Sequence, residues 1–81
     1  MQTVYVLQSE RFREKVYVGV TNDIERRIME HNQGLSGYTS KFRPWKLLTT
    51  IQFHSRSKAE EFERYLKHGS GFSFLKRHFL N

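Results

Sequence analysis

The sequence predicts an α/β fold of the α+β type, in which helices flank a three-stranded antiparallel sheet in the order β-β-α-α-β-α-α. Two runs rich in Val and Tyr, 3–8 and 15–20, predict neighbouring strands because a polar segment of hairpin length separates them. A third apolar and β-branched run, 45–54, predicts the last strand. Three strands with helices packed on them bury enough surface to be stable alone.

Start and stop residues locate the first helix. Thr21 or Asn22 can cap the free N–H groups of a helix over 23–32, and Gly34 ends it. The Gly- and Ser-rich segment that follows predicts a loop with a short helix over 38–42.

A second long helix is expected to start at a serine cap, Ser55 or Ser57, and to continue to about residue 68. The run Gly69-Ser70-Gly71 is expected to break it. Residues 72–80 then predict a short C-terminal helix that carries aromatic side chains onto the core.

The chain length of 81 residues predicts a single domain over 1–81, with a thin core because a chain this short buries only about 60% of its unfolded surface. The sequence has no cysteine, which excludes a disulfide framework and a thiolate zinc site. No apolar run approaches the roughly 20 residues of a membrane helix, and the N-terminus lacks the order of a signal peptide. A soluble cytoplasmic protein is therefore expected.

The charge balance is strongly basic. The sequence has 14 Lys and Arg against 8 Asp and Glu, which gives a formal net charge of +6. Such an excess favours a polyanion as partner, although charge of this kind also keeps small domains soluble. The cations are spread along the chain rather than gathered in a tail, and this distribution favours nucleic acid.

Helical geometry sorts the polar side chains of the first helix. At about 100° per residue, Ile24 and Ile28 define the inward stripe, and His31 falls beside Ile24. Arg27 lies at the boundary of this stripe, whereas Arg26 points to solvent. Arg27 and His31 are four residues apart and therefore share one face.

The second long helix places one carboxylate at the core margin. Ala59, Phe62 and Leu66 mark its buried side, and Glu63 lies next to that side. A partly buried carboxylate needs a cation close to it. That cation is either a Lys or Arg of the protein or a metal ion, and the sequence leaves both open.

Tyr5 and Tyr17 each stand between valines in the two neighbouring strands. An aromatic residue in a strand is usually part of the core, but each hydroxyl still needs a partner. Gly19 sits inside the second strand, where glycine is weakening unless a ligand or another backbone approaches closely. This strand is therefore expected to face such a group.

These residues form a pattern that resembles the GIY-YIG nuclease superfamily, specifically its small single-domain bacterial members related to the N-terminal nuclease domain of the excision-repair subunit UvrC. The resemblance covers essentially the whole chain and rests on several motifs in the right order. They are Thr3-Val4-Tyr5 for GIY, Tyr17-Val18-Gly19 for YIG, Arg27 in NDIERRIMEH, Glu63 in SKAEEFERYLK, the stretch TSKFRPWKLL and the tail YLKHGSGFSFLKRHF.

Two positions depart from the family pattern. Thr3 stands where the first motif has Gly, a position that needs backbone geometry rather than a side chain. Phe72 stands where small relatives often carry Arg, which implies the loss of one DNA contact and not of chemistry.

The resemblance implies a site for phosphodiester hydrolysis on one face of the sheet. Its catalytic residues would be Tyr5, Tyr17, Arg27, His31 and Glu63. Arg27 can stabilise the charge that develops on the phosphate oxygens. Glu63 can hold one Mg²⁺ or Mn²⁺, with waters and phosphate oxygens completing the coordination.

Tyr5, Tyr17 and His31 are all candidates for the base that activates the attacking water. A tyrosine, with a free pKa of about 10, needs a metal and an arginine nearby, whereas a histidine titrates closer to neutrality. We expect Tyr5 and Tyr17 to position and deprotonate the water, with His31 assisting.

The implied function is a metal-dependent DNA endonuclease of low sequence specificity in DNA repair, recombination or processing. The sequence leaves the oligomeric state open, with the monomer favoured. Its preference among nicked and branched DNA stays open. Further DNA contacts, to phosphates rather than bases, are expected from Thr39, Lys41, Arg43, Lys67, Lys76 and Arg77. The alternative is a catalytically inactive nucleic-acid binding module on the same fold, which would bind with the same salt dependence but not cleave.

Overall fold

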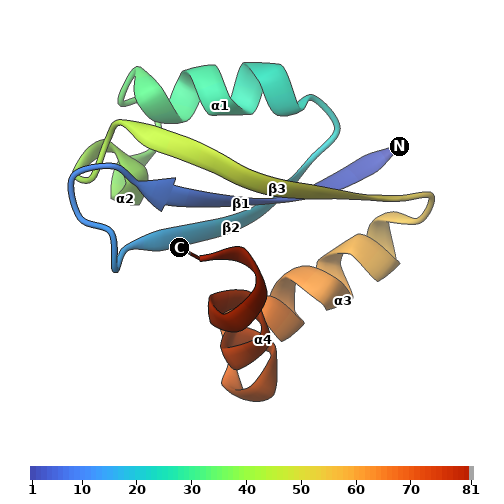
Figure 1. Ribbon diagram of the computed structural model, residues 1–81. Helices are drawn as coiled ribbons and strands as arrows, with labels where there is room; N and C mark the ends of the chain where they lie inside the picture. The colour runs from blue at the N-terminus through green and yellow to red at the C-terminus, as the bar shows by residue number, and fades with distance from the viewer. Residues whose placement is uncertain (81) are drawn as a thin grey trace.

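The computed structural model describes residues 1–80 and is built on a three-stranded antiparallel sheet (Figure 1). The strands are β1 (Gln2–Ser9), β2 (Val16–Thr21) and β3 (Trp45–Phe53), and their order across the sheet is β2-β1-β3. Each strand ends within one residue of its predicted bounds. The central position belongs to β1, which carries Tyr5 and pairs with a strand on either side.

Helices cover both faces of this sheet (Figure 1). One face carries α1 (Ile24–Asn32), which α2 (Gly37–Ser40) contacts, and the other carries α3 (Arg56–Lys67) and α4 (Gly69–Phe79). The predicted element order and the α+β class are therefore confirmed. None of the helices within residues 1–80 is long and apolar enough to cross a membrane.

The helix starts follow the predicted chemistry with one exception. The cap of α1 is Asp23, whose carboxylate accepts from the Arg26 backbone N–H at 3.2 Å, rather than Thr21 or Asn22. The Thr21 hydroxyl instead accepts from the Asp23 backbone N–H at 3.0 Å, which fixes the turn before the helix. The predicted serine cap of α3 is Ser55.

The C-terminal helix begins earlier than predicted. The sequence predicts a break over 69–71, but the break is confined to His68, whose backbone is extended, and α4 runs from Gly69. Gly69 turns the chain with φ +53°. Gly71 is buried, and α4 lies so close to α3 there that a Cβ at this position would overlap the Tyr65 carbonyl oxygen of α3. The two glycines therefore provide a turn and a close helix contact.

The alternation of side chains along the strands divides the core into two layers. The layer against α3 and α4 consists of Val4, Val6, Val18, Ala59, Leu66 and Leu75. The layer against α1 consists of Tyr5, Leu7 and Trp45, with Tyr17, Ile24 and Ile28 packed against them. Both tyrosines therefore face α1, and the predicted inward stripes of the two long helices are confirmed.

Replacing Gly71 by Ala is expected to lower the free energy of unfolding by about 1–3 kcal/mol, because the added methyl group must push α4 away from α3. For a domain of this size each kcal/mol lowers Tm by about 4–8 °C. Gly37→Ala is the control, since nothing lies within 4 Å of a Cβ there. Thermal unfolding measures both, and equal Tm values for the two variants would contradict the assignment.

Candidate active site

The phenol ring of Tyr5, on the central strand β1, lies over Gly19 of the edge strand β2. In the register of β1 with β2, the Tyr5 Cα pairs with the Gly19 Cα. A Cβ at Gly19 would lie 2.5 Å from the Tyr5 hydroxyl oxygen, so any other residue would displace the phenol ring. The sequence predicts that this strand faces a close neighbour at the glycine, and the neighbour that the structure shows there is the Tyr5 ring.

Tyr5, Tyr17 and His31 form one aromatic cluster on the face that α1 covers. The Tyr5 ring centroid is 6.1 Å from that of Tyr17 and 5.8 Å from that of His31, and the last two are 4.9 Å apart. Tyr5 is 1% exposed and His31 0%, whereas Tyr17 is half-buried. The structure thus brings together the three predicted candidates for the base.

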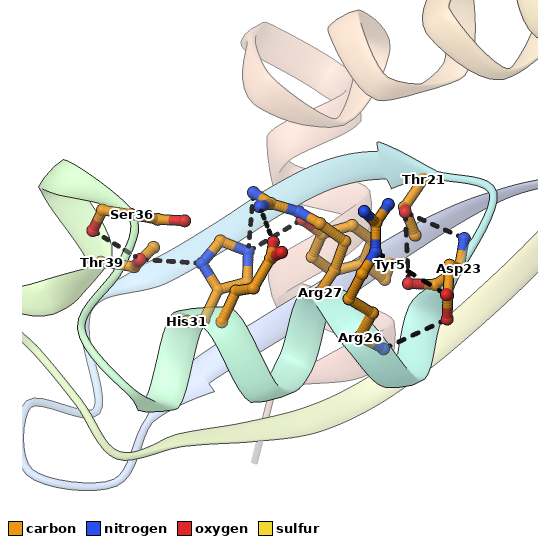
Figure 2. Close-up of polar contacts among 9 residues, drawn as sticks. Tyr5, Thr21, Asp23, Arg26, Arg27, His31, Ser36 and Thr39 are labelled. Carbon is orange, nitrogen blue, oxygen red and sulfur yellow. Dashed lines mark hydrogen bonds and ion pairs between the residues drawn. The ribbon is translucent and has the colours of Figure 1, made fainter.

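His31 is held on both ring nitrogens (Figure 2). Its Nε2 lies 2.9 Å from the Tyr5 hydroxyl oxygen, and its Nδ1 lies 2.8 Å from the Thr39 hydroxyl oxygen. Burial lowers the pKa of His31, the positive charge of Arg27 lowers it further, and the Glu30 carboxylate opposes both. The imidazole is therefore neutral at physiological pH.

The Tyr5 phenol is also kept neutral. Burial raises its pKa, and the Arg27 guanidinium opposes this shift. The nearby Tyr17 and Glu63 add to the increase. Glu63 makes the smallest of these contributions, and it lies on α3, which packs on the opposite face of the sheet.

Arg27 lies against the pair that Tyr5 and His31 form (Figure 2). Its Nη2 is 3.4 Å from His31 Nε2, and its Nη1 donates to a Glu30 carboxylate oxygen. Burial opposes the charged form, but Glu30 and Tyr5 outweigh it and raise the pKa of Arg27. The guanidinium therefore stays charged, and with its side chain 27% exposed it is reachable from solvent.

Glu63 lies at the core margin of α3, as predicted, with its side chain 22% exposed. Its carboxylate accepts from the Lys67 ammonium group at 2.9 Å, so in the free protein its cation is a lysine. Within residues 1–80 no group of three or more His, Cys, Asp or Glu side chains could hold a metal ion. A lone carboxylate still fits Mg²⁺ or Mn²⁺, because Mg²⁺ sites often use one or two carboxylates together with substrate phosphates.

The predicted DNA contacts fall into two groups. The exposed residues are Lys41, Arg43, Lys67, Lys76 and Arg77. Thr39 is only 1% exposed, and its side chain is enclosed against His31 rather than presented to solvent.

Glu30 and Tyr38 belong to the site but are not among the predicted residues. Glu30 pairs with Arg27, and the i,i+3 spacing of acid and base on one helix is the signal that could have identified it. Tyr38 stacks on Tyr17, with ring centroids 6.5 Å apart, and is half exposed. No sequence signal indicates this stack, since it depends on where α2 lies in the fold.

A protein-family model covers most of the chain. The model described as the GIY-YIG catalytic domain matches residues 1–74. The chain belongs to the GIY-YIG family. The predicted membership of the GIY-YIG family is confirmed by this match.

The relatives of this GIY-YIG domain are of two kinds. It is 39% identical over 72 residues to the structure-specific endonuclease subunit SLX1 of Scheffersomyces stipitis, covering 80% of this chain and 21% of that protein. It is 37% identical over 68 residues to a UPF0213 protein of Clostridium perfringens, covering 83% and 71%. The chain spans between 21% and 28% of the length of the SLX1 subunits that it matches.

A solved structure shares the GIY-YIG domain's architecture. The solution NMR structure of a UPF0213 protein from Bacillus halodurans superimposes with a TM-score of 0.55 at 32% sequence identity. The match covers 94% of this chain and 81% of the other. The predicted likeness to small bacterial members of the family is therefore confirmed.

The GIY-YIG domain is expected to lose stability as the pH falls below about 6.5, the free value for histidine. Because the pKa of His31 is lowered in the fold, the unfolded chain binds more protons in this range, and the free energy of unfolding decreases with decreasing pH. His31→Gln should remove this part of the pH dependence. Denaturant unfolding at pH about 7 and about 5.5 measures it.

His54→Gln is the control for this measurement, because His54 is exposed. It should keep the wild-type pH dependence. The same change in stability between the two pH values for His31→Gln and the wild type would contradict the burial of a neutral imidazole.

Proposed function

We propose that this domain is a metal-dependent endonuclease that hydrolyses DNA phosphodiester bonds. The observation that carries the proposal is the convergence of a phenol, an imidazole and a guanidinium within hydrogen-bonding distance of one point. Tyr5 comes from β1, His31 and Arg27 come from neighbouring turns of α1, and the three side chains meet there. The negative charge of Glu63 contributes to the raised pKa of the same phenol.

Arg27 is the residue that binds the scissile phosphate. It is permanently charged and is the exposed member of the group. A guanidinium can donate two parallel hydrogen bonds to a phosphate, and this interaction strengthens as charge develops on the phosphate oxygens. Phosphate then replaces the Glu30 carboxylate as the partner of Arg27, which opens the access to Tyr5 beneath it.

The proton of the attacking water passes to Tyr5 as the proton of Tyr5 passes to His31. The raised pKa of Tyr5 leaves little phenolate at neutral pH, so the phenol needs an acceptor for its own proton. Neutral His31, with Nε2 at 2.9 Å, is that acceptor. The water oxygen forms a bond to phosphorus while the bond from phosphorus to the sugar oxygen breaks. Tyr17, the more exposed tyrosine, orients the water.

Glu63 is the residue that would hold Mg²⁺ or Mn²⁺. When bound, such an ion would polarise the phosphate and stabilise the charge of the leaving oxygen. The Lys67 ammonium group must first release the Glu63 carboxylate.

DNA is held by its phosphates. The formal net charge of +6 and the exposed Lys and Arg side chains support this mode of binding. Phosphate contacts carry no sequence information, so specificity for sequence is low. The relatives named structure-specific endonuclease subunits make branched and nicked DNA the first substrates to test, in the setting of DNA repair or recombination.

The main test compares Glu63→Gln with the wild type on supercoiled plasmid and on branched and nicked DNA, with Mg²⁺ or Mn²⁺. We expect cleavage by the wild type and a loss of about 100-fold or more in the variant, because the ion loses the carboxylate proposed to hold it. Glu61→Gln is the control, since this exposed carboxylate lies on the same helix and pairs with Lys58. Binding without cleavage by the wild type would favour the inactive binding module.

Replacing each tyrosine by phenylalanine separates their roles. Tyr5→Phe should lower kcat by about 10²–10⁴ because it removes the proton relay, with little change in KM. Tyr17→Phe should have a smaller effect, because the relay through His31 remains. Steady-state cleavage kinetics measure both. If both variants cleave at the full rate while His31→Ala does not, the role given to the tyrosines is wrong.

A further inference from the structure

Thr39 is a buried polar residue that the proposed chemistry does not use. Its side chain is 1% exposed, and its hydroxyl oxygen lies between the His31 ring and the Ser36 carbonyl oxygen (Figure 2). The loop before α2 and α2 itself bring both groups to the imidazole. The Thr39 hydroxyl has one hydrogen, and whether it donates that hydrogen to His31 or to the Ser36 carbonyl oxygen determines the protonation of the His31 ring.

The single proton of the Thr39 hydroxyl is used in a hydrogen bond to the backbone. The hydroxyl donates to the Ser36 carbonyl oxygen at 3.1 Å, and a carbonyl can only accept. The Thr39 oxygen must therefore accept at its other contact, 2.8 Å away, which means that His31 Nδ1 carries the proton. A neutral imidazole has one such proton, so Nε2 carries a lone pair.

Arg27 gives a second reason for the same tautomer. Its Nη2 group faces His31 Nε2 at 3.4 Å, and a guanidinium can only donate. A proton on Nε2 would set two donors against each other, whereas a lone pair there suits both the guanidinium and the Tyr5 hydroxyl at 2.9 Å. Contacts on both sides of the ring thus agree.

We propose that Thr39 is a positioning residue, which fixes His31 in the tautomer whose Nε2 can accept the Tyr5 proton. This role deepens the proposed function and rests on it. The ring is 0% exposed, so water cannot easily replace the missing acceptor. Without the Thr39 oxygen, the imidazole would place its proton on Nε2 and donate to Tyr5, and the phenol would have no acceptor.

Few other groups compete for the imidazole. The titratable groups that face it are Tyr5 and Tyr17 from the strands and Arg27 and Glu30 from α1. Among residues 1–80, the side-chain hydrogen bonds place Tyr5 and Arg27 on Nε2 and Thr39 on Nδ1. The tautomer is therefore controlled from the Nδ1 side by a single hydroxyl.

The experiment compares the wild type with Thr39→Val and Thr39→Ser. Nitrogen-15 NMR of the imidazole reports which nitrogen of His31 carries the proton, and cleavage assays give kcat and KM. We expect Nδ1–H in the wild type and in Thr39→Ser, with similar kcat. We expect Nε2–H in Thr39→Val, with kcat lower by about 100-fold or more and KM for DNA nearly unchanged.

Three results would overturn the inference. They are a wild-type His31 protonated on Nε2, a Thr39→Val variant that keeps Nδ1–H, and a Thr39→Ser variant that loses as much kcat as Thr39→Val. The wild-type spectrum and the serine variant decide the question even if the valine variant does not fold. If the wild type cleaves no DNA, the proposed function fails, while the NMR comparison still tests the control of the tautomer by Thr39.

Discussion

The position of Tyr5 opposite Gly19 is the constraint on which the site depends. Because side chains alternate along a strand, the register of β1 with β2 decides which face of the sheet each tyrosine meets. If the pairing shifted by one residue, Tyr5 would no longer lie opposite Gly19. The two tyrosines would also no longer both contact His31. Gly19 then determines where the ring lies, since only a residue without a Cβ lets the phenol cross the edge strand.

The buried part of the site is uncharged, and its charges lie at the rim. Burial keeps both Tyr5 and His31 neutral, because a low dielectric disfavours their charged forms. Arg27 and Glu63 are partly exposed, and each has its own counter-ion. A neutral hydrogen-bonded pair can be enclosed more easily than an ion pair. The fold therefore encloses Tyr5 and His31, the groups proposed to transfer protons, away from solvent. It leaves the charged side chains of Arg27 and Glu63 accessible to a polyanion.

The sequence predicts the elements of this fold well because periodicity and capping are local signals. The core stripes and the position of Glu63 at the core margin follow from helical spacing alone. Partners that lie on other elements, such as Thr39 for His31, depend on tertiary placement and could not be predicted. Thr39, in a Gly- and Ser-rich loop, has the sequence context of a surface residue but is enclosed. Gly71 has the context of a helix breaker, yet it marks the contact of two helices.

The Lys67 ammonium group, which is paired with the Glu63 carboxylate, competes for that carboxylate with any cation in solution. The ammonium group is attached one helical turn away, so its effective concentration at the carboxylate is high. Exchange becomes favourable when another anion receives the displaced lysine, and a DNA phosphate is such an anion. If Glu63 holds a metal ion as proposed, binding of that ion and binding of DNA would be thermodynamically linked, each strengthening the other by the same factor.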